Sequence, residues 1–276
     1  MNKKIIILIG SLLLIVICSI MFLISREDTT GKLKIYFFNA GKADSCIIYN
    51  DDFAVMIDTG EKELGEEILT YLNDNNITKL DYLIITHFDK DHVGSASTVI
   101  NSIEVDNVIQ SNYPKESKVY NKYLSALENK GIEAVTLRED LEFNFGDAYF
   151  TINPPIEDVY SNNESNNSSL IVSLKYKNNS FLFMGDAENL RIKEYLSNNN
   201  DSYDFLKVPY HGHYQTTLDE LFKVIKPKYS VITSSIEEME DKTTLELLSN
   251  IESKTYLTRN GSILITSDGN TINIKQ

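Results

Sequence analysis

The chain has 276 residues, a net charge of −14 and a hydrophobic fraction of 42%. This balance is ordinary for a globular protein and supplies enough apolar mass for one large core or two small ones. The acidic surplus disfavours an extended, sequence-independent nucleic-acid groove, since such surfaces are usually basic. A small phosphate-containing substrate remains compatible with it, because metal ions can supply positive charge locally.

An uncharged apolar run occupies residues 5–24, between Lys3-Lys4 and the polar segment that begins at Arg26. At about 1.5 Å per residue, a helix of this length spans roughly 30 Å, the thickness of a bilayer core. The positive-inside rule then predicts a single-pass protein in the cell membrane, with its main domain outside the cytoplasm. The alternative is a secreted protein released by signal-peptide cleavage, although the run is long for a signal peptide and lacks a small-residue cleavage site.

Strand and helix patterns begin after a short polar linker. Three strand-like runs separated by turn residues predict an antiparallel meander, followed by a helix and a strand buried on both faces. A helix and further strands follow, and a polar loop then leads into a hairpin. The predicted elements are strands at 33–38, 45–49, 53–57, 80–86, 133–137, 148–153, 170–176 and 181–184, helices at 63–73 and 116–130, and a loop at 160–169.

The last third of the chain continues the alternation of helices and strands. The predicted helices are 187–196, 217–224 and 243–250, and the predicted strands are 205–209, 229–233, 254–258, 261–267 and 271–275. No Pro/Gly-rich linker divides residues 32–276. We therefore expect a stub, anchor and linker at 1–31 and one domain at 32–276. The order of elements predicts two mixed sheets with helices outside, in the α/β or α+β class.

All four histidines fall in two short segments, each following an apolar strand. His87 and His92 follow the first strand, and His211 and His213 follow the second. The ends of such strands are where α/β architectures place ligands and catalytic groups. The two segments are therefore expected to form one site.

The segment from His87 to His92 holds four metal-type side chains in six residues, the other two being Asp89 and Asp91. Imidazole nitrogens and carboxylate oxygens are zinc-type ligands. Two carboxylates held this close repel each other unless a cation neutralises them. A strand-end loop with solvated carboxylates is the alternative, but the second histidine cluster favours a metal site.

The run His87-Phe88-Asp89-Lys90-Asp91-His92 resembles the H-x-H-x-D-H motif of metallo-β-lactamase-fold hydrolases, with aspartate at the middle ligand position. That variant, followed by glycine, is similar to the hydrolase domain of the competence DNA-uptake protein ComEC family. Further segments match this branch in its own order and cover nearly all of the predicted domain. They are FFNAGKAD at 37–44, IDTG at 57–60, NNSSL at 166–170, MGDAE at 184–188, KVPYHG at 207–212 and TRNG at 258–261.

This resemblance implies a four-layer αββα sandwich that holds two divalent ions, Zn²⁺ or Mn²⁺. It assigns His87 and Asp89 to the first ion and three residues to the second, with Asp186 bridging the two; these three are Asp91, His92 and His211. The third histidine of the family's first site is absent, and Asn167 in the matching segment is expected to be a weak ligand or to contact a ligand. An oxygen-rich first site favours Mn²⁺ beside Zn²⁺ and partial occupancy.

Four other residues are expected near the site. Asp58, after a buried strand, is expected to orient a ligand histidine. Tyr210 replaces the first histidine of a matched H-H-G segment and is expected to pack in the wall or to donate to a bound anion. His213 is a candidate proton donor or substrate contact. Lys207 is either a phosphate contact or a strand lysine that reaches solvent.

These expectations together predict a membrane-anchored, metal-dependent hydrolase that attacks phosphodiester bonds with a metal-bound hydroxide. Asp91 would hold the attacking water and accept its proton. The expected substrate is a nucleic acid or a small phosphate-containing molecule, and the sequence identifies no protein partner. Two alternatives remain: a non-catalytic ligand- or partner-binding domain with a degraded first site, and a hydrolase of esters or lactones. Aspartate at position 89 disfavours β-lactam hydrolysis.

Overall fold

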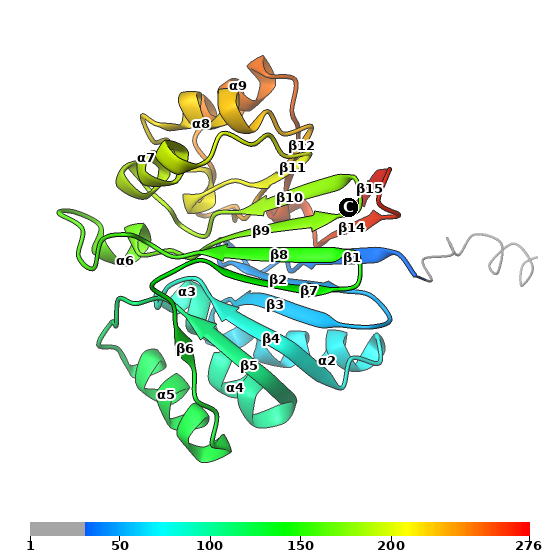
Figure 1. The fold of residues 1–276 in the computed structure, drawn as a ribbon, viewed down its shortest axis with the longest axis vertical. Coiled ribbons are helices and arrows are strands. Elements are labelled where there is room, and N and C mark those ends of the chain that lie inside the picture. Colours follow the sequence, from blue (N-terminus) through cyan, green and yellow to red (C-terminus); the bar gives the residue numbers. More distant parts are fainter. Residues whose placement is uncertain (1–30) are drawn as a thin grey trace, which may run out of the picture. The chain divides into compact units, whose positions relative to one another are not determined.

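The computed structural model describes residues 31–276, and Lys32–Gln276 form one compact unit. Two β-sheets lie face to face in it (Figure 1). The eight-stranded sheet has the order β15-β14-β1-β2-β3-β4-β5-β6. Its strands are β1 (Leu33–Phe37), β2 (Ser45–Tyr49), β3 (Ala54–Thr59), β4 (Lys79–Ile85), β5 (Glu104–Gln110), β6 (Val135–Thr136), β14 (Ile263–Ser267) and β15 (Ile272–Lys275).

The second sheet has seven strands in the order β13-β12-β11-β10-β9-β8-β7. Its β9–β10 hairpin is antiparallel, and Phe181 of β10 pairs with Leu174 of β9. The strands are β7 (Leu141–Phe145), β8 (Ala148–Asn153), β9 (Ile171–Tyr176), β10 (Asn179–Phe183), β11 (Phe205–Lys207), β12 (Tyr229–Ile232) and β13 (Lys254–Leu257).

Helices cover the outer faces of both sheets, so the unit has four layers (Figure 1). Helices α2, α4 and α5 lie outside the eight-stranded sheet, and α7, α8 and α9 lie outside the other. The helices are α2 (Gly65–Asp74), α3 (Lys90–Val93), α4 (Ala96–Ser102), α5 (Lys118–Lys130), α6 (Glu164–Asn167), α7 (Asn189–Asn198), α8 (Leu218–Ile225) and α9 (Lys242–Asn250), with short 3₁₀ turns at Lys62–Leu64, Tyr210–Gly212 and Thr258–Asn260.

Aromatic side chains fill the space between the two sheets. The ring of Phe37 in β1 lies 6.2 Å from that of Phe183 and 5.9 Å from that of Phe205, both in the opposite sheet. All three side chains are buried. Burying a phenylalanine contributes about 1.5–3 kcal/mol, so these residues hold the sheets together and fix the distance between the loops at their ends.

The parallel strands of each sheet position the loops that carry the polar motifs. Strands β3, β4 and β5 run parallel in one sheet, and β10, β11 and β12 run parallel in the other. Parallel strands end at the same edge of a sheet. The segments after β3, β4, β10, β11 and β12 therefore meet at one edge of the sandwich.

Local sequence explains where the elements begin and end. The Ser117 hydroxyl accepts a hydrogen bond from the Tyr120 N–H at the start of α5, and Gly131 ends the helix with φ = 65°. Serine is a preferred N-cap residue, and glycine adopts the left-handed conformation without steric strain. This helix was predicted from the sequence at residues 116–130.

The predicted two-sheet sandwich is confirmed, but five helices and strands were missed, one of them helix α3 within the histidine segment. Strand β5 has no regular alternation of apolar residues, since three of its seven residues are exposed. Helix α4 directly follows the histidine segment, and no element was predicted there. Strand β7 is short, and one turn of helix, α6, lies inside the predicted loop 160–169.

The expected membrane anchor needs correction. Within residues 31–276, no helix is long and apolar enough to cross a bilayer, so single-pass anchoring is not supported. Residues 5–24, on which the expectation rested, lie outside the described part of the chain, as does the signal-peptide alternative.

Candidate metal centre

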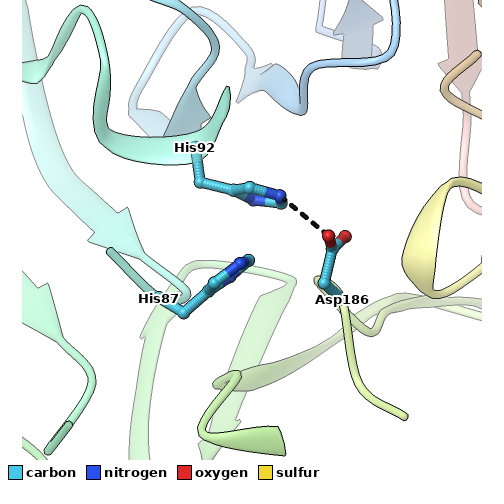
Figure 2. Close-up of side chains that lie close together, drawn as sticks. All are labelled: His87, His92 and Asp186. Atoms are coloured by element: carbon cyan, nitrogen blue, oxygen red, sulfur yellow. Dashed lines mark ion pairs between the residues drawn. The ribbon is translucent and has the colours of Figure 1, made fainter. Parts of the chain in front are cut away.

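Three side chains from distant segments converge at the shared edge of the sheets. His87 follows β4, His92 lies in α3, and Asp186 follows β10. Figure 2 shows the two imidazole rings pointing toward the Asp186 carboxylate, with the ion pair between His92 Nε2 and Asp186 Oδ2 dashed at 3.3 Å. One ligand atom from each of the three residues lies within 4.8 Å of the others.

A second group shares His92 with the first and lies on the other side of Asp186. It consists of Asp91, His92 and His211, again with one ligand atom of each within 4.8 Å of the others. His211 Nε2 lies 3.0 Å from Asp186 Oδ2 and 3.6 Å from Asp91 Oδ2. Asp186 therefore stands between His92 and His211.

Four atoms of this cluster are buried without a hydrogen-bond partner in the described part of the chain. They are Nε2 of His87, His92 and His211, and Oδ1 of Asp186. Leaving a buried polar group unpaired costs about 1–3 kcal/mol. The Nε2 atoms of His92 and His211 lie 3.3 and 3.0 Å from the other carboxylate oxygen, Asp186 Oδ2, whereas Oδ1 lies 3.8 Å from Lys207 Nζ. Imidazole nitrogens gathered around a carboxylate are the donor set of a divalent metal site. The residues present therefore fit the metal that their chemistry implies.

The charge balance points the same way. Four buried carboxylates lie in and around the cluster, from Asp44, Asp58, Asp91 and Asp186, and the buried ammonium group beside them is that of Lys207. Buried charges are normally paired or bound to metals. The excess of negative charge favours a bound cation.

The three histidines have different electrostatic surroundings. Burial, together with the neighbouring His92, lowers the pKa of His87 to about 4. Burial also opposes a charge on His211, but Asp186 and Asp44 outweigh it and raise its pKa to about 9. The pKa of His92 is raised well above its usual value, because Asp186 and Asp58 overcome the same burial. Positive charge is therefore stabilised most strongly around His92 and His211.

Unusual backbone conformations hold several of these groups in place. Asp58, Tyr210 and His211 have φ values of 54°, 49° and 51°, a left-handed region that costs a non-glycine residue about 1–3 kcal/mol. Gly185, with φ = 51°, lets the chain pass closely, because a Cβ there would lie 3.1 Å from Ser169 and Thr86. Such strain at one edge of the fold is typical of functional sites.

The structure places Asp89 away from the convergent atoms. Its carboxylate accepts hydrogen bonds from Ser165 and from Lys115, whose Nζ lies 2.6 Å from Oδ1. Within residues 31–276, the groups close enough to share an ion do not include Asp89. The assignment of His87 and Asp89 to one ion therefore stays a prediction, with the Asp89 carboxylate held by Lys115 and Ser165.

Asn167 also faces away from the cluster. Its amide donates to backbone carbonyl oxygens of Asn162 and Asn163, and its Oδ1 accepts from the Arg191 N–H. The hydroxyl of Ser169 lies closer to the site, 3.4 Å from His87 Nδ1. Asn167 therefore joins the loop to α7, while Ser169 contacts the histidine.

Lys207 is neither a solvent-reaching lysine nor accessible to a substrate. It is 3% exposed, pairs with Asp44 and donates to the Gly185 carbonyl oxygen at 3.0 Å. Asp58 contacts a ligand-type histidine, since its Oδ2 lies 2.8 Å from His92 Nδ1. Asp58 thus contacts the ligand-type His92 through Nδ1, and Lys207 pairs with buried carboxylates of the site.

Tyr210 and His213 lie at the rim. Their ring centroids are 5.1 Å apart, and the His213 side chain is 32% exposed and lies 3.9 Å from Asp241. Neither residue belongs to the groups that share ligand-atom spacing. Tyr210 and His213 therefore lie beside each other outside these groups, and the role of His213 stays a prediction.

Sequence reasoning missed three site residues: Asp44, Thr86 and Thr233. Asp44 accepts from Thr233 and lies 3.5 Å from His211 Nδ1, while the Thr86 hydroxyl donates to Asp58 at 2.6 Å. Asp44 ends the matched segment 37–44, and Thr86 directly precedes His87, so their positions gave some indication. No sequence pattern indicated Thr233, because it follows β12 and reaches His211 only through the fold.

Comparisons with known proteins agree with this geometry. The chain is 28% identical over 239 residues to ComE operon protein 3 of Bacillus subtilis, covering 79% of this chain and 30% of that protein. It is 24% identical over 238 residues to recombination protein 2 of Haemophilus influenzae, covering 84% of this chain and 28% of that protein. The chain therefore spans less than a third of either relative. The two matches confirm the ComEC-like resemblance drawn from the motifs.

Among solved structures, the fold is similar to the metallo-beta-lactamase fold protein YhfI from Bacillus subtilis. The TM-score is 0.60 at 9% identity, covering 86% of this chain and all of that one. Residues 39–234 match the family model described as the metallo-beta-lactamase superfamily. That segment contains the candidate metal centre and most of both sheets, and the chain therefore belongs to the metallo-β-lactamase superfamily.

Proposed function

We propose that this chain is a metal-dependent hydrolase that cleaves phosphodiester bonds, in a nucleotide-sized molecule or in a nucleic acid. The observation that carries the proposal is the set of three buried histidine Nε2 atoms without hydrogen-bond partners, which face Asp186. Members of the superfamily are mostly metal-dependent hydrolases, but a fold alone does not fix a reaction. The substrate class is therefore argued from the residues around the metal centre.

One tightly held ion is the minimum that these residues support. A neutral imidazole nitrogen has one lone pair, so His92 Nε2 can serve only one of the two groups it belongs to. Asp91, His92, His211 and Asp186 can hold one ion, and a five-coordinate ion held by these residues would keep a position for water or substrate. His87 shares only Asp186 with this group, so a second ion beside His87 would be held more weakly. A bound divalent cation, Zn²⁺ or Mn²⁺, would act here as a Lewis acid toward substrate and water oxygens.

Two lysines at the mouth favour an anionic substrate in an otherwise acidic protein. Lys42 Nζ lies 3.8 Å from Asp91 Oδ2 and 2.9 Å from Glu238 Oε2, and its side chain is 29% exposed. Lys115, paired with Asp89, is 42% exposed on the other flank. Each ammonium group can turn from its carboxylate to a phosphate oxygen without leaving the site. Lys42 and Lys115 thus replace Lys207 as the proposed phosphate contacts.

A polar pocket of about 450 Å³ extends from Asp89 between Lys115 and the segment Asn163–Asn166. Ligand pockets commonly range from about 300 to 1,000 Å³. This pocket can therefore hold the group attached to the phosphate, such as a nucleoside. Within the site, Asp91 is the proposed proton acceptor and His213 the proposed donor to the leaving oxygen.

The test uses the purified protein, stripped with a chelator and reloaded with Zn²⁺ or Mn²⁺. We expect hydrolysis of bis(p-nitrophenyl) phosphate to return with the metal and to exceed that of p-nitrophenyl acetate. Lys42→Gln should raise KM for the diester several-fold, whereas Lys122→Gln, at an exposed position of α5, should leave it unchanged. Preferential hydrolysis of the acetate would instead support an ester or lactone substrate.

A non-catalytic binding domain is the second candidate, favoured by the position of Asp89 on Lys115 and Ser165. It predicts tight metal binding without hydrolysis of either compound. A purified protein that neither binds metal tightly nor hydrolyses either compound would contradict both candidates.

A further inference from the structure

Two threonine hydroxyls lie behind the candidate metal centre, each between a histidine and a buried carboxylate. Thr86 Oγ1 is 3.2 Å from His87 Nδ1 and 2.6 Å from Asp58 Oδ2. Thr233 Oγ1 is 3.1 Å from His211 Nδ1 and donates to Asp44 Oδ1. The two triplets come from different strands of different sheets, yet their atoms are connected in the same order.

The available protons determine which atom donates in each hydrogen bond of the two triplets. A carboxylate oxygen only accepts hydrogen bonds, so each threonine must place its single hydroxyl proton on its aspartate. The hydroxyl oxygen can then only accept from the histidine, which must carry its proton on Nδ1. The lone pair of a neutral ring is thereby left on Nε2, the atom that faces the metal centre without a partner.

We propose that Thr86 and Thr233 are positioning residues. Each threonine hydroxyl donates to a buried carboxylate and accepts from Nδ1 of a ligand histidine, a hydrogen-bond relay that leaves Nε2 free to bind the metal. His92 needs no relay, because Asp58 Oδ2 contacts its Nδ1 directly at 2.8 Å. Asp58 thus orients His92 directly and His87 through Thr86, while Asp44 orients His211 through Thr233. The inference rests on the proposed metal site but not on the proposed substrate.

On the His211 side, Asp44 Oδ1 also lies 3.5 Å from Nδ1 and favours the same tautomer as Thr233, whereas on the His87 side a second hydroxyl offers a competing arrangement. Ser169 Oγ lies 3.4 Å from His87 Nδ1 and accepts from the Asp186 N–H at 3.1 Å. If the Ser169 hydroxyl donated to Nδ1, the ring proton would move to Nε2 and the ring could not bind a metal. Thr86 and Ser169 therefore favour opposite tautomers, which makes the relay testable.

The first experiment determines the His87 tautomer in the metal-stripped full-length protein at pH 7, from imidazole ¹⁵N chemical shifts. The same spectra show whether the ring is neutral, because a charged imidazole carries protons on both nitrogens. We expect the Nδ1–H form in the wild type, Thr86→Ser and Ser169→Ala, and the Nε2–H form in Thr86→Val. An unchanged tautomer in Thr86→Val, or a switch in Ser169→Ala, would overturn the relay, whatever the enzyme hydrolyses.

The second experiment measures Zn²⁺ affinity by competition with a chromophoric chelator. Loss of a hydrogen-bonded neighbour of a ligand typically weakens metal binding about 10–100-fold. We expect this loss in Thr233→Val and recovery in Thr233→Ser, with thermal unfolding showing that both variants fold. Equal losses in the valine and serine variants would mean that packing, not the hydroxyl, matters, and would contradict the proposal.

Discussion

The two sides of the candidate metal centre differ in charge. On one side, the Nδ1 atom of His87 has hydroxyl neighbours, Thr86 and Ser169, at 3.2 and 3.4 Å. On the other, His211 has carboxylate oxygens of Asp186, Asp44 and Asp91 within 3.0–3.6 Å. Burial and the neighbouring His92 lower the pKa of His87 to about 4, whereas Asp186 and Asp44 outweigh burial and raise the pKa of His211 to about 9.

This difference in charge suggests different roles for the two sides, one in binding the metal ion and the other in binding substrate. The His211 side concentrates negative charge, which favours a tightly bound cation. The His87 side is poorer in ligands, and Asp89, two residues after His87, lines the pocket that contains Lys115. We infer that the His211 side holds the resident ion, and that the His87 side accommodates substrate and a weaker second ion.

The largest effect should come from removing one histidine from each side. His211→Ala should weaken Zn²⁺ binding by more than about 100-fold, beyond the effect of losing a neighbour of a ligand, and should abolish turnover. His87→Ala should keep close to one tightly bound ion per chain while turnover falls. Metal analysis after gel filtration measures both. The reverse order of metal loss would show that the tight ion lies with His87.

The next effect concerns Lys207, whose ammonium group lies between Asp44 and Asp186 on the His211 side. Removing one partner of a buried ion pair typically costs about 3–5 kcal/mol. Lys207→Met should therefore lower the free energy of unfolding in urea by that amount, and Zn²⁺ should restore part of the loss by neutralising Asp186. The exposed variant Lys223→Met, on α8, is the control. A stable Lys207→Met protein would mean that the buried charges are balanced in another way.

The sequence predicted much of this site because its chemistry is concentrated in short motifs. His87, His92 and Asp91 share six residues, and Asp186 and His211 follow strands whose apolar runs are easy to identify. Parallel strands then place their carboxyl ends at one edge, so convergence of these segments follows from topology. Asp58 was expected beside a histidine for the same reason.

The remaining features depend on side-chain partners that no local pattern encodes. The direction of the Asp89 carboxylate is set by Lys115 and Ser165, which lie 26 and 76 residues further along the chain. Lys207 was expected at the surface or on substrate because nothing near it in the sequence indicates Asp44. Its burial follows from tertiary pairing alone.

The smallest effect should separate the two aspartates of the histidine segment. Asp89→Asn should change Zn²⁺ affinity by less than about threefold, because its carboxylate contacts Lys115 and Ser165 rather than the convergent atoms. Asp91→Asn should weaken binding far more, since Asp91 Oδ2 lies 3.6 Å from His211 Nε2. Both replacements keep the side-chain shape and remove one charge, so simple loss of negative charge predicts equal effects. A loss in Asp89→Asn as large as in Asp91→Asn would show that Asp89 leaves Lys115 to bind the ion. The His87 side would then be a full ion site rather than the substrate side.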